Sequence, residues 1–171
     1  VMLGSFLNVL IIRIHEETPW WEGRSRCPVC KKELDWYELL PVVSFLIQRG
    51  ECRNCKTPIS WQYPLIEIMA GLTAAGVLYK FGFNLESLLV FLILYFMIGS
   101  FTSDLKFMEI PELFTIGGIV LAFVYAIFFS DVSVWNIIIG GVVGFLFFFI
   151  QYVATKGNGL GEADIKLGIL M

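Results

Sequence analysis

Long apolar runs separated by short polar connections make up most of this chain. Four runs, at residues 63–81, 85–103, 113–130 and 134–155, approach the roughly 20 apolar residues that a membrane-spanning helix needs and carry few charges. The runs are continuous rather than alternating, and each must satisfy its own backbone hydrogen bonds in lipid, which favours helices over barrel strands. The predicted fold class is therefore an all-α membrane protein, a polytopic transmembrane helical bundle.

Both ends of the chain carry shorter apolar runs. Residues 1–14 are too short to span a membrane, and a further run has barely begun when the chain stops at Met171. We therefore expect a fragment of about six helices whose first and last helices are both truncated. A signal peptide is a poor alternative for residues 1–14, because Asn8 interrupts the run and no small-residue cleavage site follows it.

Polar residues concentrate in one insert, residues 15–62, which holds 14 of the 27 charged side chains. The whole chain is only 16% charged, against about 25% in ordinary soluble domains, and it is 57% hydrophobic. These values exclude a disordered chain and a typical soluble enzyme. The predicted domains are a first helix at 1–14, the insert at 15–62 and a transmembrane domain at 63–171.

The positions of the basic residues predict how the helices cross the membrane. The connections 15–62, 104–112 and 156–164 fall on one face, and 11 of the 12 Lys and Arg residues lie on or beside them. Because positive residues accumulate on the cytoplasmic side, this face is predicted to be cytoplasmic. Residues 34–47 of the insert are apolar and aromatic, so the insert is expected to pack back on the lipid bilayer. No basic tract indicates a nucleic-acid partner.

Every cysteine lies in the insert, as the pairs Cys27-x-x-Cys30 and Cys52-x-x-Cys55 with 21 residues between them. Each pair forms a tight turn that aims two sulfurs at one ion, and Zn²⁺ accepts four thiolates in a tetrahedron. Because protein atoms fill all four positions, the spacing predicts a structural Zn²⁺ without a catalytic role. The alternatives are an iron–sulfur cluster and a pair of disulfides, and the reducing cytoplasm disfavours the disulfides.

Carboxylates at the edges of the apolar runs are candidates for function, because charge at membrane level is costly. Three stand out: Glu67, Asp104 and Asp164. Asp104 is predicted to end one helix and Asp164 to open another, both on the cytoplasmic side and therefore at one depth. Two carboxylates that share a proton can hydrolyse a peptide, one activating water and the other polarising the carbonyl. The alternative is that each aspartate is a solvent-exposed loop residue beside a lysine, Lys106 or Lys166.

Other catalytic arrangements have less support. His15 is the only histidine in the chain, which argues against a Ser–His–Asp triad and an HExxH zinc site. It is expected at the membrane interface just past the first helix. A Ser–Lys pair, formed by Ser100 or Ser103 with Lys106, stays open as a minor alternative.

The motifs in order resemble those of the type IV prepilin peptidases, bifunctional enzymes of bacterial pilus, competence and type II secretion systems. The similarity runs over nearly the whole chain. It is carried by six blocks: Gly4-Ser-Phe-Leu-Asn8-Val, the two cysteine pairs, Pro58-Ile-Ser, Tyr63-Pro-Leu-Ile-Glu67, Asp104 followed at a distance by Ile110-Pro111, and Gly159-Leu-Gly161-Glu-Ala163-Asp164-Ile-Lys166-Leu. The last block resembles the family's GxGD element.

The resemblance implies an aspartic endopeptidase of the bacterial inner membrane. Such an enzyme cuts the short basic leader from prepilin-like precursors at the cytoplasmic face and then N-methylates the new terminus from S-adenosylmethionine. Asp104 and Asp164 match the two catalytic aspartates, and residues 63–171 become the transmembrane peptidase domain. Glu67, Asn8 and the zinc insert are candidates for a role in methylation by association only. A carboxylate satisfied by neighbouring helices is the alternative for Glu67.

One position departs from the family pattern, because Ala163 stands where the GxGD motif has glycine. If the backbone there needs a positive φ, alanine costs about 1 kcal/mol or more; otherwise the change is small. Two other functions therefore stay open. One is a monofunctional methyltransferase or peptidase, and the other is a non-enzymatic membrane assembly subunit whose zinc insert binds a cytoplasmic partner.

Overall fold

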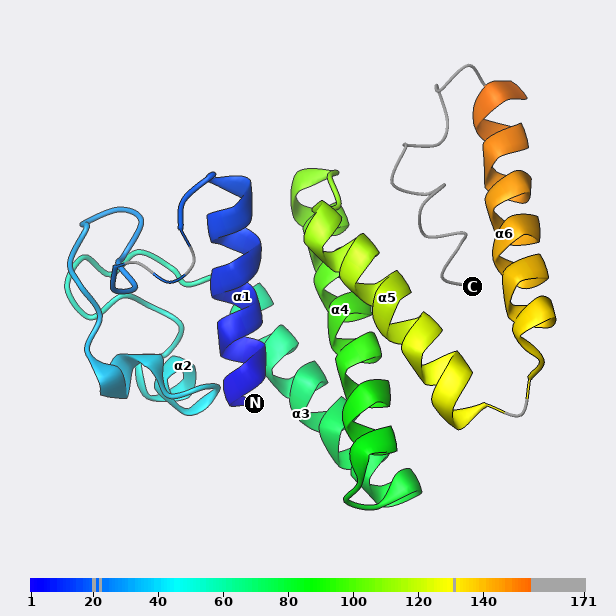
Figure 1. Cartoon of the computed structure of the whole chain (residues 1–171). Coiled ribbons are helices and arrows are strands. Elements are labelled where there is room, and N and C mark those ends of the chain that lie inside the picture. The colour runs from blue at the N-terminus through cyan, green and yellow to red at the C-terminus, as the bar shows by residue number, and fades with distance from the viewer. Residues whose placement is uncertain (20, 22, 131, 155–171) are drawn as a thin grey trace. The chain divides into compact units, whose positions relative to one another are not determined.

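The computed structural model describes residues 1–19, 21, 23–130 and 132–154. Over these residues the chain forms six α-helices and one 3₁₀ turn, and no strand beyond two isolated bridges (Figure 1). The elements, in order, are α1 (Met2–His15), η1 (Trp36–Leu39), α2 (Val43–Ile47), α3 (Gln62–Phe81), α4 (Leu85–Phe107), α5 (Glu112–Phe129) and α6 (Val134–Ala154). The prediction of an all-α fold is confirmed.

Four helices, α3 to α6, are long and apolar enough to cross a membrane, as judged by length and composition alone. Their bounds agree with the predicted runs to within one residue, except at the end of α4. That helix continues four residues past Ser103 to Phe107, where Met108 adopts a left-handed conformation and its N–H donates to the Asp104 carbonyl. Hydropathy marks the end of the apolar run, whereas the backbone hydrogen bonds mark the end of the helix.

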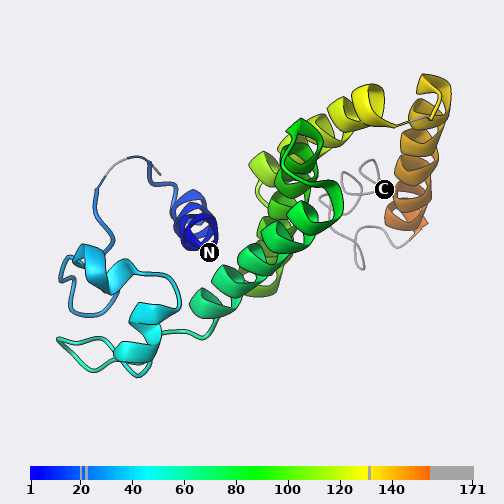
Figure 2. The same cartoon turned by 90° about the horizontal axis from the view of Figure 1, so that it is seen from below.

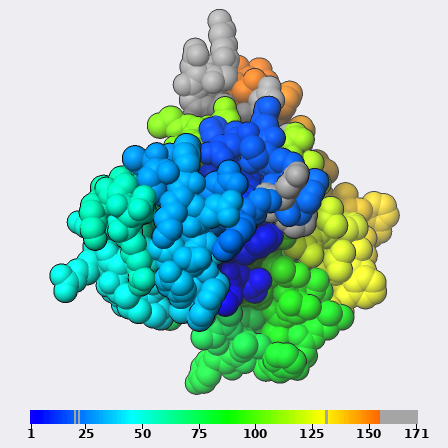
Figure 3. Space-filling model, turned by 90° about the vertical axis from the view of Figure 1, so that its left-hand side faces the viewer, coloured from blue at the N-terminus to red at the C-terminus, as the bar shows by residue number. Residues whose placement is uncertain are grey.

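The chain divides into two compact units, residues 1–76 and 77–171. Unit 1 contains α1, the insert and the first part of α3; unit 2 contains the end of α3 and α4 to α6. The domain boundaries at residues 14 and 62 stay a prediction. Figure 3 looks onto the insert of unit 1, coloured from blue to cyan.

In unit 1, α1 and α3 lie in direct backbone contact at Gly4. A Cβ added there would lie 2.6 Å from the Glu67 Cα and 2.9 Å from the Ile66 carbonyl oxygen. Lipid gives helices no hydrophobic reason to associate, so small residues that allow such close approach are the usual contact points. Leu7, Ile11 and Ile66 are almost fully buried beside this contact.

In unit 2, α4 and α5 lie side by side as an antiparallel pair (Figures 1 and 2). The turn between them uses the left-handed Met108 and the helix-starting Pro111. A Cβ added at Gly99 would meet the ring of Phe114 at 2.8 Å, so this glycine admits the buried Phe114 side chain. The close packing holds the end of α4 in a defined position.

Candidate functional site

The two cysteine pairs form matching turns in the insert. In the first, the N–H of Lys31 donates to the Cys27 carbonyl, and the Cys27 N–H donates to the carbonyl of Lys32. In the second, Lys56 and Thr57 bond to Cys52 in the same way. Lys31 and Lys56 both have positive φ, 58° and 59°, which closes each turn tightly enough to aim two sulfurs the same way.

The four sulfur atoms lie close enough together to bind one metal ion. All four Sγ atoms lie within 4.8 Å of one another, with Cys27 and Cys55 at 3.7 Å and Cys30 and Cys52 at 4.0 Å. A tetrahedral ion with bonds of about 2.3 Å keeps its sulfurs about 3.8 Å apart, so these residues fit Zn²⁺. The cysteines are free thiols, and both separations are far longer than the roughly 2.05 Å of a disulfide bond.

Hydrogen bonds to Cys55 and Cys30 favour the thiolate form that a metal requires, whereas burial raises the pKa of the Cys27 thiol. The Thr57 hydroxyl lies 3.2 Å from Cys55 Sγ, and together with the Thr57 backbone N–H it lowers the pKa of the Cys55 thiol to about 6. The backbone N–H of Lys32 likewise lowers the pKa of the Cys30 thiol. The insert therefore contains a four-cysteine cluster suited to a metal ion.

Each cysteine turn is supported by residues that follow it. After the first turn, Asp35 and Glu38 form a reciprocal capping box at η1, and the buried Glu38 carboxylate lies 3.6 Å from Lys32 Nζ. After the second, the Ser60 hydroxyl accepts from the Gln62 N–H at the start of α3. Sequence analysis did not single out Glu38, although an Asp-x-x-Glu spacing is a known capping signal.

Glu67 is buried in α3 and holds part of the insert. Its Oε2 accepts the Val42 N–H at 2.7 Å, and Val42 has φ 62°, a conformation that β-branched residues strongly disfavour. The carboxylate is thus satisfied by a neighbouring segment, as one of the sequence alternatives stated. The sequence does not predict a positive φ at Val42, because valine rarely adopts one.

Asn8, also buried, joins α1 to the start of α3. Its amide donates to the carbonyls of Gly4 and Tyr63, and its Oδ1 accepts from Gln62. The contacts of Asn8 and Glu67 describe a packing role within unit 1. A role for either residue in binding a methyl donor stays a prediction.

Asp104 lies in the last turn of α4, four residues before the left-handed Met108. Its side chain is exposed and, among the residues that the structure describes, makes no hydrogen bond or ion pair. The ammonium of Lys106 lies 5.0 Å from the centre of the Phe107 ring. Asp104 therefore presents an accessible carboxylate in the last turn of α4, near the helix end at which the sequence placed it.

Asp164, the predicted second carboxylate, lies outside the described residues, as do Ala163 and the start of the last apolar run. The Ser–Lys alternative gains no support. Ser103 is completely buried and its hydroxyl has no hydrogen-bond partner within the described part of the chain, whereas Lys106 is exposed. His15 is the last residue of α1 rather than a residue beyond it.

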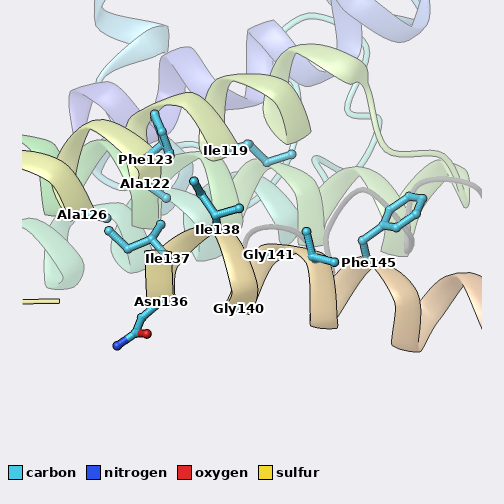
Figure 4. A pocket seen from close by; sticks show the side chains of 11 residues that line it. Ile119, Ala122, Phe123, Ala126, Asn136, Ile137, Ile138, Gly140, Gly141 and Phe145 are labelled. Carbon is cyan, nitrogen blue, oxygen red and sulfur yellow. The ribbon is translucent and has the colours of Figure 1, made fainter. Parts of the chain in front are cut away.

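A separate cavity of about 510 Å³ lies between α5 and α6 of unit 2 (Figure 4). Its lining is apolar apart from Asn136, and Figure 4 shows the Asn136 side chain directed away from the labelled residues of α5. Asp104 is not among the lining residues. The cavity therefore has none of the acids, bases or thiols that a catalytic site needs.

These features define a multi-pass membrane protein with a four-cysteine insert and an accessible carboxylate near the end of a spanning helix. Residues 1–81 match the bacterial peptidase A24 N-terminal domain, and residues 90–171 match the type IV leader peptidase family. The chain belongs to the prepilin leader peptidase/N-methyltransferase family.

Several relatives are similar over nearly the whole chain. A prepilin leader peptidase/N-methyltransferase of Bacillus subtilis is 34% identical over 98% of this chain and 67% of its own length. Proteins of the same name from Myxococcus xanthus and Vibrio cholerae are 34% and 30% identical, over 50% and 71% of their lengths. The chain thus spans half of the Myxococcus protein and about two thirds of the Bacillus protein. No solved structure matches the chain.

Proposed function

We propose that this protein is a membrane-embedded aspartic endopeptidase that removes the leader from type IV prepilin-like precursors and N-methylates the new terminus. The observation that carries the peptidase half is the exposed Asp104 carboxylate in the last turn of α4, within the region similar to type IV leader peptidases. The names of the relatives support both activities.

In this proposal Asp104 and Asp164 form the catalytic pair. One carboxylate, ionised, takes a proton from the attacking water, and the other, protonated, donates a hydrogen bond to the scissile carbonyl oxygen. The water oxygen bonds to the carbonyl carbon, the C–N bond breaks, and the proton passes to the leaving nitrogen, which becomes the α-amino group of the mature chain. The α4–α5 contact at Gly99 and Phe114 supports this role, because catalytic side chains must be held on rigid elements.

The insert has a structural role in the same proposal. Cys27, Cys30, Cys52 and Cys55 would hold Zn²⁺, which ties the two cysteine turns into one folded unit. S-adenosylmethionine, when bound, supplies an electrophilic methyl group to the new α-amino nitrogen, which loses a proton as S-adenosylhomocysteine is formed. The insert and both aspartates are proposed to lie on the cytoplasmic side of the bacterial inner membrane, in keeping with the distribution of Lys and Arg.

The test measures the mass of a purified prepilin substrate after incubation with the protein in detergent and S-adenosylmethionine. Asp104→Asn and Asp164→Asn are the test variants. Glu109→Gln is the matched control, because it removes an exposed carboxylate from the α4–α5 connection. We expect loss of the leader and the gain of one methyl group with the parent protein and with Glu109→Gln, and an intact precursor with either aspartate variant.

Each other result identifies a different function. Cleavage without methylation indicates a peptidase alone, whereas methylation of a pre-cleaved substrate without cleavage indicates a methyltransferase whose peptidase is inactive. If the precursor stays intact with every variant while a known homologous enzyme cuts it, the peptidase proposal fails. Loss of function only on Cys→Ser substitution would then favour an assembly subunit.

A further inference from the structure

We infer that a groove in the insert, between α2 and the second cysteine turn, is the binding site for the methyl donor S-adenosylmethionine. The inference rests on the proposed methyltransferase activity and assigns it a location. The residues that carry it are Phe45, Arg49, Glu51 and Trp61. The groove contains neither Asn8 nor Glu67; it lies within the insert, which the sequence had named only as a whole.

The groove has the dimensions of a small-molecule site. It encloses about 440 Å³, within the range of roughly 300–1,000 Å³ that is usual for ligand pockets. One wall is apolar and aromatic, from Phe45, Leu46 and Trp61. Arg49 and Glu51 lie along the other part of the lining, on either side of Gly50.

The lining offers the donor an aromatic ring, a cation and a carboxylate. The Trp61 ring is 74% exposed and packs edge-on against Phe45, with centroids 4.8 Å apart, so its open face can stack on the adenine. An aromatic face also attracts the sulfonium cation. Arg49 can pair with the amino-acid carboxylate, and Glu51 with the ribose hydroxyls or the ammonium group.

Backbone geometry holds this groove open at the end of α2. Arg49 and Gly50 both have positive φ, 54° and 72°, and the Gly50 N–H donates to the Phe45 carbonyl. The Ile59 N–H donates to the Gly50 carbonyl at 2.7 Å, which brings the strand-like segments around Glu51 and Pro58 together. This pairing continues directly into the turn at Cys52, so a metal bound there would also fix the walls of the groove.

The first cysteine turn provides an internal control. Trp36 follows Cys27 by nine residues, just as Trp61 follows Cys52, and the two rings are equally exposed at 74%. Trp36, however, contacts Tyr37 edge-on and does not line the groove. A general role in membrane attachment would involve both tryptophans, whereas donor binding involves Trp61 only.

The experiment measures binding of tritium-labelled S-adenosylmethionine to the purified protein by equilibrium dialysis, without a prepilin substrate. Trp61→Ala and Arg49→Ala are each expected to weaken binding about tenfold or more, which corresponds to about 1.4 kcal/mol. Trp61→Phe keeps an aromatic face and should stay within about threefold of the parent protein, on the scale of ring-stacking energies. Trp36→Ala should bind as the parent does, and zinc content near one ion per chain verifies that each variant is folded.

Three results would overturn the inference. Trp61→Ala that keeps its zinc and binds the donor normally places the site elsewhere. An equal loss on Trp36→Ala and Trp61→Ala assigns the tryptophans to the membrane surface. If the parent protein cleaves prepilin yet binds no labelled S-adenosylmethionine, the groove is not a donor site. Failure of the parent and Trp36→Ala to cleave prepilin would instead count against the proposed peptidase, whatever the dialysis shows.

Discussion

The interactions that stabilise unit 1 internally differ from those that stabilise unit 2. Unit 1 combines the close contact of α1 and α3 at Gly4 with polar contacts between segments far apart in the sequence, such as Glu67 with the Val42 N–H and Asn8 with the Tyr63 carbonyl. Unit 2 depends mainly on apolar surfaces in close contact, such as Gly99 against Phe114. One side-chain hydrogen bond joins α4 and α5: the Tyr125 hydroxyl donates to the Glu86 carboxylate. This bond lies near the opposite end of the α4–α5 pair from Asp104.

The difference follows from the surroundings of each unit. In lipid, helices gain nothing from hydrophobic association, so the helices of unit 2 are held by close packing of small residues against aromatic rings. The insert, with fewer than 50 residues, is too small for a hydrophobic core of its own, and chains of that size usually need a metal or disulfides. Hydrogen bonds, together with the metal that the four cysteines are proposed to hold, would therefore do in the insert much of what side-chain packing does in unit 2.

Removing the metal should have the largest effect and should affect only the insert. Structural zinc contributes roughly 10 kcal/mol or more to folding, so chelation or Cys52→Ser should expose the insert to proteolysis. Ser25→Ala, beside the first cysteine turn, is the control and should resist protease like the parent. Limited proteolysis with mass analysis locates the cuts. An equally resistant insert without metal would mean that hydrogen bonds alone hold the turns closed.

Asp104→Asn should abolish most of the peptidase activity without changing the stability of either unit. Cleavage of prepilin is expected to fall roughly 10³-fold, a usual loss for removal of an acid or base. The Asp104 side chain is exposed and makes no hydrogen bond or ion pair with a described residue, so zinc content and melting temperature should not change. Quantitative mass spectrometry of the product gives the rate. A variant that melts at a lower temperature and loses activity in proportion would indicate a structural aspartate.

Glu67→Ala should loosen unit 1 by about 2–3 kcal/mol, because it leaves the Val42 N–H without its charged acceptor. Glu67→Gln keeps an oxygen that accepts the same hydrogen bond and should recover more than half of that loss. Hydrogen exchange of residues 40–43, followed by mass spectrometry, is the measurement. Equal exchange in the alanine and glutamine variants would show that the bond does not hold this segment.

Gly99→Ala should have the smallest effect and should affect unit 2. The added Cβ would lie 2.8 Å from the Phe114 ring, and displacing that ring should cost about 1–2 kcal/mol. Gly140→Ala in α6 is the matched control, because nothing lies within 4 Å of a Cβ built there. Thermal unfolding in detergent should therefore separate the two variants, and equal melting temperatures would contradict close packing at Gly99.

Much of the fold was predictable because its signals are local. Length and apolarity alone predicted α3, α5 and α6 to within one residue, and the Cys-x-x-Cys spacing anticipated the four-sulfur cluster. The end of α4 was not predicted, because the polar residues after Ser103 end the apolar run without ending the helix. Asp104 lies within this unpredicted extension of α4, in its last turn.

The partner of each buried polar group depends on the tertiary structure, since sequence patterns do not report which distant segments meet. Nothing in the sequence pairs Glu67 with Val42, 25 residues earlier, or gives Val42 a positive φ. The sequence does not predict the groove beside Trp61 either, because Trp36 and Trp61 each follow the first cysteine of a pair by nine residues. The sequence by itself determined the helices, the insert and the candidate chemistry, all of which depend on periodicity and spacing. Only the folded chain decided which carboxylate is used for packing, which is left accessible and which tryptophan faces a groove, because these depend on contacts across the fold.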